Sequence, residues 1–461
     1  MTSYSVVSGG EPAKDATALT FGTGAAPVAE VPPLPDRPCL VPGVEFLGQY
    51  QGSGFATPQW LLRRPDRQVV QVSTLLYLVA EYANGELTRH DIASRVSERY
   101  GRTVSADNVA YLLDRKLAPL GLTDVPFDHD PSGASAPRAN PVLALRARRP
   151  LIPEAGVAVI ARAFAPLFHG FVVAAVLGAL VALDGWLFGV QGLGAALTGV
   201  LANPALILVV LALALASMVF HEFGHAAACR YGGARPGVIG GGLYLLWPAL
   251  YTDVTDTYRT NRIGRLRTDL GGIYFNAVFA LGVATAYGFT SSGPLLVAIL
   301  VIHLEIFQQL LPVVRLDGYF VLTDLVGVPD LLGRVRPTLL SLAPRRWRDP
   351  AVQPLKPHIR VIVAGWVFVV VPLLAMNLVW LVVISPRLVT VAAHSAQTQW
   401  TTILSAVAHR NTLTAIVAMV EMLTLLLPIT GILLLFTVLI RRMAHAMAGV
   451  VARISRAGEN G

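Results

Sequence analysis

The chain has 461 residues, of which 54% are hydrophobic and only 14% are charged, and its formal net charge is +8. An ordinary soluble domain carries roughly 25% charged residues, so this composition excludes a protein that is soluble along its whole length and indicates a membrane protein. Basic loops on the cytoplasmic side of a membrane explain the positive charge better than nucleic-acid binding does, and the two cysteines, Cys39 and Cys229, argue against a structural disulfide.

The first 150 residues have the composition of soluble sequence. Residues 1–43 are rich in Gly, Ala, Pro, Thr and Ser without apolar periodicity, which predicts a disordered leader, and they lack the pattern of a cleavable secretory signal. Residues 44–126 predict a small α+β domain. Residues 127–160, with a stretch rich in Pro and Ala, predict a linker and juxtamembrane segment.

The α+β domain is expected to be winged-helix-like. Two β-type runs joined by a polar turn over residues 60–72 predict a hairpin. Three helices are expected to follow, beginning near Ser73, Thr88 and Ser105, with apolar residues at three-to-four spacing in the second and third. Such a unit is large enough for a modest core of its own.

Long apolar runs dominate the rest of the chain, and six are long enough to cross roughly 30 Å of hydrocarbon as helices. They cover residues 164–184, 203–222, 270–290, 294–313, 360–384 and 415–440. The Gly-rich run Gly237–Leu250 is too short to span and predicts a re-entrant or interfacial element. The expected fold class is therefore an all-α polytopic membrane protein with a small N-terminal winged-helix-like domain.

Basic residues in the loops predict the orientation. Arg and Lys gather before the first span, after the second and fourth spans and in the tail after the sixth, whereas the connections after the first and third contain none. We expect a multi-pass protein of the cell (inner) membrane with both termini cytoplasmic. Its membrane part divides into a core at residues 161–345, additional helices at 346–440 and a basic cytoplasmic tail at 441–461.

The stretch His221-Glu222-Phe223-Gly224-His225, at the cytoplasmic end of the second span, carries the strongest chemical signal. Histidines four residues apart project from one face of a helix and can bind a single zinc ion, and Glu222 is placed to act as a general base on zinc-bound water. The structural alternative is a pair of histidines satisfied by neighbours at a helix end. Ionisable groups at membrane depth are costly and usually functional, which favours the zinc site.

A hydrolytic zinc site needs a third protein ligand and an open fourth position. The carboxylate candidates are Asp253, Asp256, Asp269, Glu305 and Asp317. Asp317 is preferred because the fourth span returns to the cytoplasmic face and ends around Pro312, and because Gly318 permits a tight backbone turn at that depth.

These motifs together resemble those of the site-2 protease family of intramembrane zinc metalloproteases. The resemblance rests on His221–His225, on Gly272-x-x-x-Asn276 in the third span and on Leu316-Asp317-Gly318 after the fourth, and it covers residues 155–345. Within that family the chain is most similar to bacterial peptide zinc metalloprotease proteins, which also have a soluble segment before the membrane core and extra spans after it.

The resemblance implies that His221, His225 and Asp317 bind Zn²⁺ and that Glu222 is the catalytic base. It also implies that Asn276 holds the substrate strand or the developing oxyanion. The small-xxx-polar spacing that ends at Asn276 is equally typical of plain helix packing, so both interpretations stay open.

The fourth span carries further polar residues. Gln309-Leu310-Leu311-Pro312 stands where the family often has Asn-x-x-Pro, so no role is assigned to that amide. His303 and Glu305 lie two residues apart and so face different directions on a helix. Each is either functional or satisfied by an interhelical hydrogen bond. Glu421, in the sixth span, is expected to be structural or to lie at a helix interface.

The N-terminal domain has two interpretations. Acidic residues offset the arginines of its second helix, so no nucleic-acid partner is expected. Its arrangement resembles the leader-recognition domains of ribosomal-peptide biosynthesis, which bind a peptide as an added strand at a sheet edge. That resemblance implies leader-peptide binding by residues 44–126, and a packing or regulatory domain is the alternative.

Two functions compete for the whole chain. In the first, it is a zinc-dependent endopeptidase that acts in or at the bilayer on a peptide or a membrane-associated protein, as in maturation of a ribosomally made peptide. In the second, it is a catalytically silent membrane scaffold or peptide-export partner. The complete set of Glu222, two histidine ligands and Asp317 favours the enzyme.

Overall fold

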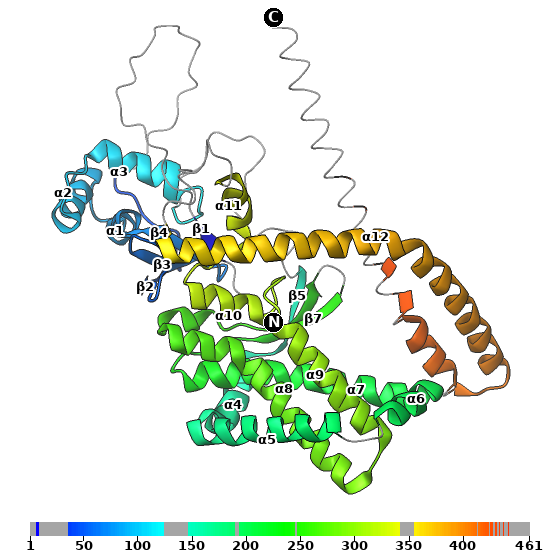
Figure 1. The fold of residues 1–461 in the computed structure, drawn as a ribbon. Coiled ribbons are helices and arrows are strands. Elements are labelled where there is room, and N and C mark those ends of the chain that lie inside the picture. The colour runs from blue at the N-terminus through cyan, green and yellow to red at the C-terminus, as the bar shows by residue number, and fades with distance from the viewer. Residues whose placement is uncertain are drawn as a thin grey trace, which may run out of the picture.

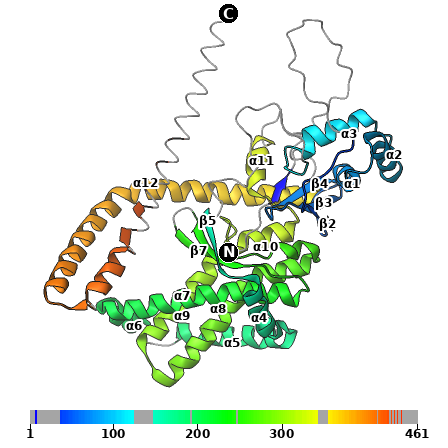
Figure 2. The same cartoon turned by 180° about the vertical axis from the view of Figure 1, so that it is seen from behind.

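The protein consists of a helical core and a small sheet domain near its N-terminus. The computed structural model describes residues 6–8, 36–123, 146–189, 193–244, 247–341, 355–412 and 414–423, with scattered positions from 425 to 441. Figures 1 and 2 show the N-terminal domain, in blue and cyan, next to the green core and beside the start of the long helix α12 (Pro357–Ala408). Most of the described residues are helical.

The N-terminal domain is built on a four-stranded sheet. The expected hairpin is present as β3 (Gln59–Arg63) and β4 (Val69–Ser73), and β2 (Glu45–Gln49) pairs antiparallel with β3. The fourth strand, β1 (Val6–Ser8), pairs in parallel with the other side of β4. This strand lies in the segment that was expected to be disordered. Main-chain hydrogen bonds to a sheet edge can hold a strand that has no repeating apolar pattern, so the composition gave no sign of it.

Three helices follow the hairpin at the expected positions. They are α1 (Thr74–Tyr82), α2 (Arg89–Tyr100) and α3 (Ala106–Leu112), which continues as a π-helix over Leu113–Leu117. Each begins at a side-chain cap, and Thr88 and Asp91 form a reciprocal capping box at the start of α2. Leu62, Val79 and Ile92 are fully buried in the core that the helices and the hairpin share.

Among the described residues, five helices are long and apolar enough to cross a membrane. They are α5 (Gly170–Gly189), α7 (Pro204–Tyr231), α8 (Arg262–Thr290), α9 (Gly293–Leu310) and α12. The first four pack around a shared apolar core together with the short helix α6 (Leu193–Ala202). Helix α5 is preceded by α4 (Glu154–Phe164), so the first span begins later than the sequence predicted.

The C-terminal helices differ from the expected pair of simple spans. Helix α12 has 52 residues, about 78 Å at 1.5 Å per residue, which is more than twice the thickness of a bilayer core. Figure 1 shows it crossing beside the core and then bending, and Pro372 and Pro386 inside it remove two helical hydrogen bonds. Of the expected sixth span, 415–440, the continuously described part is the short apolar helix Thr414–Leu423.

The run Gly237–Leu250 forms a β-hairpin. Its strands are β6 (Ile239–Tyr244) and β7 (Trp247–Thr252), and β5 (Arg146–Ile152), from the expected linker, pairs with β6 to give the order β5-β6-β7. Glycine is required at position 240, because a Cβ atom there would lie 2.5 Å from the Arg149 carbonyl oxygen. Gly240 therefore serves close strand packing.

A buried arginine connects the N-terminal domain to the core through hydrogen bonds. Arg265 of α8 is fully buried, and its guanidinium donates to Asp324 Oδ1 at 2.9 Å and to the Gln51 carbonyl at 2.8 Å. The Tyr50 hydroxyl donates to the same Asp324 oxygen at 3.1 Å, and burial raises the pKa of Tyr50 well above its usual value of 10. Asp324 belongs to α10 (Asp317–Val326), so the N-terminal domain contacts the helix that begins with Asp317.

Candidate metal centre

Helix α7 carries the paired histidines in its last three turns. His221 and His225 are four residues apart and are 2% and 0% exposed, so both imidazoles point into the protein. Their Nε2 atoms lie 3.0 Å apart. His225 Nδ1 lies 2.8 Å from the Thr268 carbonyl oxygen, to which it donates, and this bond leaves Nε2 as the ring atom with a lone pair.

Asp317 reaches the histidines from the first residue of α10. Its side chain is fully buried, and Oδ2 lies 2.8 Å from His221 Nε2 and 3.3 Å from His225 Nε2. The neighbouring Gly318 allows this approach, because a Cβ atom there would collide with the carbonyl of Leu310 at the end of α9. Glycine is needed at position 318 because the start of α10 lies close to the end of α9. Its φ is not in the left-handed region, so the expected tight turn is not the reason.

The geometry of the three ligand atoms fits a zinc ion. Ligands 2.0–2.1 Å from zinc in a tetrahedral site lie about 3.3 Å from one another, and the three observed separations are 2.8, 3.0 and 3.3 Å. Asp317 Oδ1 has no hydrogen-bond partner among the described residues, and Oδ2 faces the two imidazoles. A buried carboxylate without hydrogen bonds is costly, and a metal ion would satisfy it. Within the described part of the chain, this is the one His, Cys, Asp or Glu cluster that could hold a metal.

Glycines let the third span approach the metal ligands. A Cβ atom on Gly272 of α8 would lie 2.5 Å from His225 Nε2 and closer still to His221 Nε2. One residue earlier, Gly271 and Gly224 of α7 are packed so closely that a Cβ atom on either would overlap backbone of the other. Small residues at both positions therefore place α8 directly against the imidazoles.

Glu222 is buried next to the centre and has a partner from the sheet. The Thr252 hydroxyl, at the end of β7, lies 2.8 Å from Glu222 Oε2 and 3.0 Å from the Glu222 carbonyl oxygen. Both residues are at most 1% exposed. Thr252 was not predicted, because nothing in the sequence indicates that a hairpin would return to α7.

Asn276 lies one helical turn beyond Gly272, on the face of α8 that meets α7. It is 2% exposed, and its Oδ1 atom lies 3.4 Å from the hydroxyl of Ser217, one turn before His221. The structure thus places the amide one helical turn from the glycine that touches the imidazoles, next to Ser217.

Four of the other ionisable candidates have partners away from the three ligand atoms. Asp253 and Asp256 bind arginines of the N-terminal domain and its surroundings, at the surface between the domain and the core. His303 lies 2.6 Å from Asp184 of α5, which agrees with an interhelical hydrogen bond. Glu421 accepts a hydrogen bond from Gln399 of α12, as expected for a residue at a helix interface.

Comparison with known proteins gives one limited match. A segment of 116 residues, 25% of this chain, is 25% identical to the Bacillus subtilis (strain 168) protein named "Putative peptide zinc metalloprotease protein YydH". The matched segment covers 46% of that relative's length. No protein-family model matches the chain, and no solved structure does so either. The similarity supports a relation to a zinc metalloprotease.

Proposed function

We propose that this chain is a zinc-dependent endopeptidase of the site-2 protease type, acting in or at a membrane on a peptide or membrane-associated protein. The observation that carries the proposal is the convergence of His221, His225 and Asp317 on one buried point, with Glu222 beside it. These residues come from two helices that are far apart in the sequence. An apolar helix bundle has no structural need for such a cluster, because ionisable groups at membrane depth are costly.

The proposed roles follow from the donor atoms. His221, His225 and Asp317 would hold the ion and leave its fourth position to water, whose pKa zinc lowers toward about 7. Glu222 would take the proton of that water and pass it to the leaving amine. The Asn276 amide would hold the substrate strand or the oxyanion.

The proposal is tested by two substitutions in the full-length protein. Glu222→Gln should abolish cleavage, a loss of roughly 10²-fold to 10⁴-fold for a general base, and should leave zinc bound. His221→Ala should lower the zinc content measured by elemental analysis. Equal and negligible zinc in the wild type and His221→Ala would favour the silent scaffold or export partner, and retained turnover in Glu222→Gln would refute the role of the base.

The N-terminal domain is proposed to bind a peptide at the outer edge of β4. The supporting observation is that Val6–Ser8 already pairs with this edge in parallel, from Val6 opposite Val69 to Ser8 opposite Gln71. Deleting residues 1–10 should raise the hydrogen exchange of the β4 amides, and an added substrate peptide should restore their protection. Unchanged exchange in both steps would favour a packing domain.

The location is proposed to be the cell (inner) membrane with cytoplasmic termini. The apolar helices indicate a membrane protein, and the basic loops supply the orientation. Cysteine labelling with a membrane-impermeant reagent in intact and opened cells tests it, at exposed Cys39. Labelling of intact cells would contradict a cytoplasmic N-terminal domain.

A further inference from the structure

The strongest unassigned feature is the contact between Thr252 and Glu222. The Thr252 side chain is 0% exposed, and both oxygens within reach of its hydroxyl belong to Glu222. A hydroxyl has one proton, so it donates either to the carboxylate at 2.8 Å or to the carbonyl at 3.0 Å. The carboxylate is both the closer and, when ionised, the stronger acceptor, so the hydroxyl donates to Glu222 Oε2.

This contact restricts the orientation of the Glu222 carboxylate. The last torsion of a glutamate side chain is soft and has no narrow preferred angle, so the carboxylate needs an outside partner to keep one orientation. Proton transfer requires that the carboxylate lie within hydrogen-bond reach of the water it deprotonates. A hydroxyl fixed at the end of a strand supplies one such restraint.

Thr252 is in turn held by the residue after it. The backbone of Asp253 forms hydrogen bonds in both directions with the start of β6, to the Val238 carbonyl at 2.9 Å and from the Gly237 amide at 2.7 Å. Its Oδ1 atom accepts bonds from the amide and hydroxyl of Thr255. The remaining oxygen, Oδ2, accepts a bond from Arg67 at 2.9 Å.

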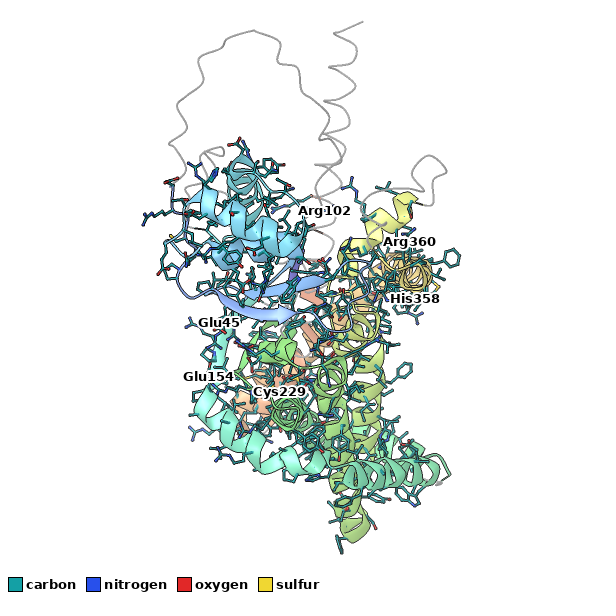
Figure 3. All side chains as sticks on the ribbon, turned by 90° about the vertical axis from the view of Figure 1, so that its left-hand side faces the viewer. Glu45, Arg102, Glu154, Cys229, His358 and Arg360 are labelled. Carbon is teal, nitrogen blue, oxygen red and sulfur yellow. The ribbon has the colours of Figure 1, made fainter. Side chains whose placement is uncertain are left out.

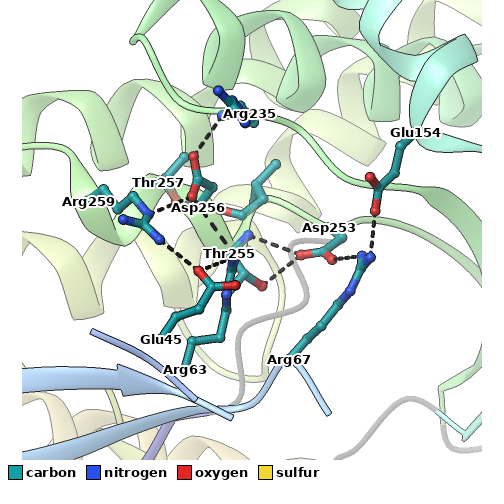
Figure 4. Close-up of polar contacts among 11 residues, drawn as sticks. Glu45, Arg63, Arg67, Glu154, Arg235, Asp253, Thr255, Asp256, Thr257 and Arg259 are labelled. Carbon is teal, nitrogen blue, oxygen red and sulfur yellow. Dashed lines mark hydrogen bonds and ion pairs between the residues drawn. The ribbon is translucent and has the colours of Figure 1, made fainter. Parts of the chain in front are cut away.

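Arg67 belongs to the N-terminal domain. It lies in the turn between β3 and β4 with a φ of 65°, a left-handed angle that is uncommon for a non-glycine residue. Figure 4 shows its guanidinium between Asp253 and Glu154. Glu154 begins α4, the helix that packs on α7 through Val157 and Ala161, and Figure 3 places Glu154 near the level where the domain meets the core.

We propose that Thr252 is the positioning residue for Glu222, and that Arg67 of the N-terminal domain keeps Thr252 in place through Asp253. The domain thereby sets the orientation of the catalytic base. This inference rests on the proposed function, because it needs Glu222 to act as a base.

A second set of ion pairs at the same surface serves as a comparison. Glu45 binds Arg63 at 2.6 Å and Arg259 at 2.8 Å, and Arg259 also binds Asp256 at 2.9 Å (Figure 4). These pairs join the domain to the core, but none of them includes Asp253, Thr252 or Glu222. General docking would be weakened equally by loss of either set, whereas positioning of the base depends on Arg67.

The first experiment tests Thr252 in the purified full-length protein, with fluorescein-labelled casein as the probe. Thr252→Val should lower kcat about 10-fold to 100-fold with KM and zinc content unchanged, since it removes part of what a general base contributes. Thr252→Ser, which keeps the hydroxyl, should restore kcat. Thr323→Val is the matched control, because Thr323 is equally buried but donates to its own helix at the Phe320 carbonyl.

The second experiment tests the link to the N-terminal domain. Arg67→Gln should lower kcat about 3-fold to 10-fold and raise hydrogen exchange at the Gly237 and Asp253 amides. Combining it with Asp253→Asn should cause little further loss, because coupled residues are not additive. Arg64→Gln is the control, since Arg64 pairs with Asp66 in the same turn.

The outcomes separate the inference from the function that it rests on. If Thr252→Val matches Thr323→Val while Glu222→Gln is inactive, the positioning role is overturned and the protease stands. If Arg67→Gln matches Arg64→Gln in both exchange and kcat, the link to the domain is overturned. If the wild type neither cleaves casein nor holds more zinc than His221→Ala, the protease itself falls, and the inference falls with it.

Discussion

Substitution of Gly272 by alanine tests the metal centre without touching a proposed ligand. The added Cβ atom would lie 2.5 Å from His225 Nε2, whereas ordinary van der Waals contact begins at 3.4 Å. The overlap is at least about 0.9 Å, and the closest atom is Nε2 of His221, which would bind the metal. Relief requires that α8 or the imidazoles move by nearly that amount, and α8 is already in contact with Gly224 at its preceding residue.

The expected result is loss of zinc and of turnover together. A displacement of about 1 Å in a reacting geometry costs on the order of 10²-fold in rate. Moving the histidines from their positions against Asp317 should also lower zinc affinity, since binding depends on all three ligand atoms lying about 3.3 Å apart. Zinc retained after dialysis against graded chelator concentrations measures the affinity, and casein cleavage measures the rate.

The matched control lies on the same helix. A Cβ atom on Gly282 would meet no atom within 4 Å, so Gly282→Ala should keep zinc and activity. It should raise helix stability by up to about 1 kcal/mol, because alanine is the better helix former. Wild-type zinc affinity in Gly272→Ala would show that the imidazoles do not face α8, and the proposed centre would have to be abandoned.

Three further predictions concern the third ligand and the docking of the N-terminal domain. Asp317→Asn should weaken zinc binding by at least about 10-fold to 100-fold in the same dialysis assay, and an unchanged affinity would remove Asp317 from the ligand set. Arg265→Ala should cost about 3–5 kcal/mol of unfolding free energy, because it leaves Asp324 buried without its cation, and a loss below about 1 kcal/mol would contradict this. The bond from Arg63 lowers the pKa of Glu45 below its ordinary 4.5, so the stabilisation is present above that pH and is lost as pH falls through the lowered pKa. With a side chain that is 45% exposed, the pair contributes under about 1 kcal/mol, so the small difference in Tm between wild type and Glu45→Gln at neutral pH should vanish on acidification.

The sequence predicted the centre because its spacing is local. His221 and His225 share a helix face at any helix position, and the direction of the fourth span brings Asp317 back to the same depth. The N-terminal helices were predictable for a similar reason, since Thr88 and Ser105 are caps that act within three residues. The paired histidines and the helix caps depend on short-range geometry, whereas Asp317 was predicted from the return of the fourth span.

The partners of those residues were not predictable, because they depend on pairing between distant segments. β5 was expected to be a linker, and it became a strand only because β6 offers it an edge. Thr252 is then brought to Glu222 by the length of the β6–β7 hairpin, and a single threonine has no sequence signal for that role. The contact of Arg67 with Asp253 joins residues 186 positions apart.

The position of β1 connects the proposed peptide site with the proposed control of the base. β1 runs parallel to β4 and begins at Val6 opposite Val69, two residues after Arg67. Any strand bound at this edge in that direction would start opposite Val69, beside the β3–β4 turn that contains Arg67. Arg67 binds Asp253, Asp253 follows Thr252, and Thr252 bonds Glu222. One continuous set of contacts therefore connects this sheet edge to the Glu222 carboxylate. A peptide that stabilised this turn would therefore favour the active arrangement, which requires no movement of the N-terminal domain as a whole.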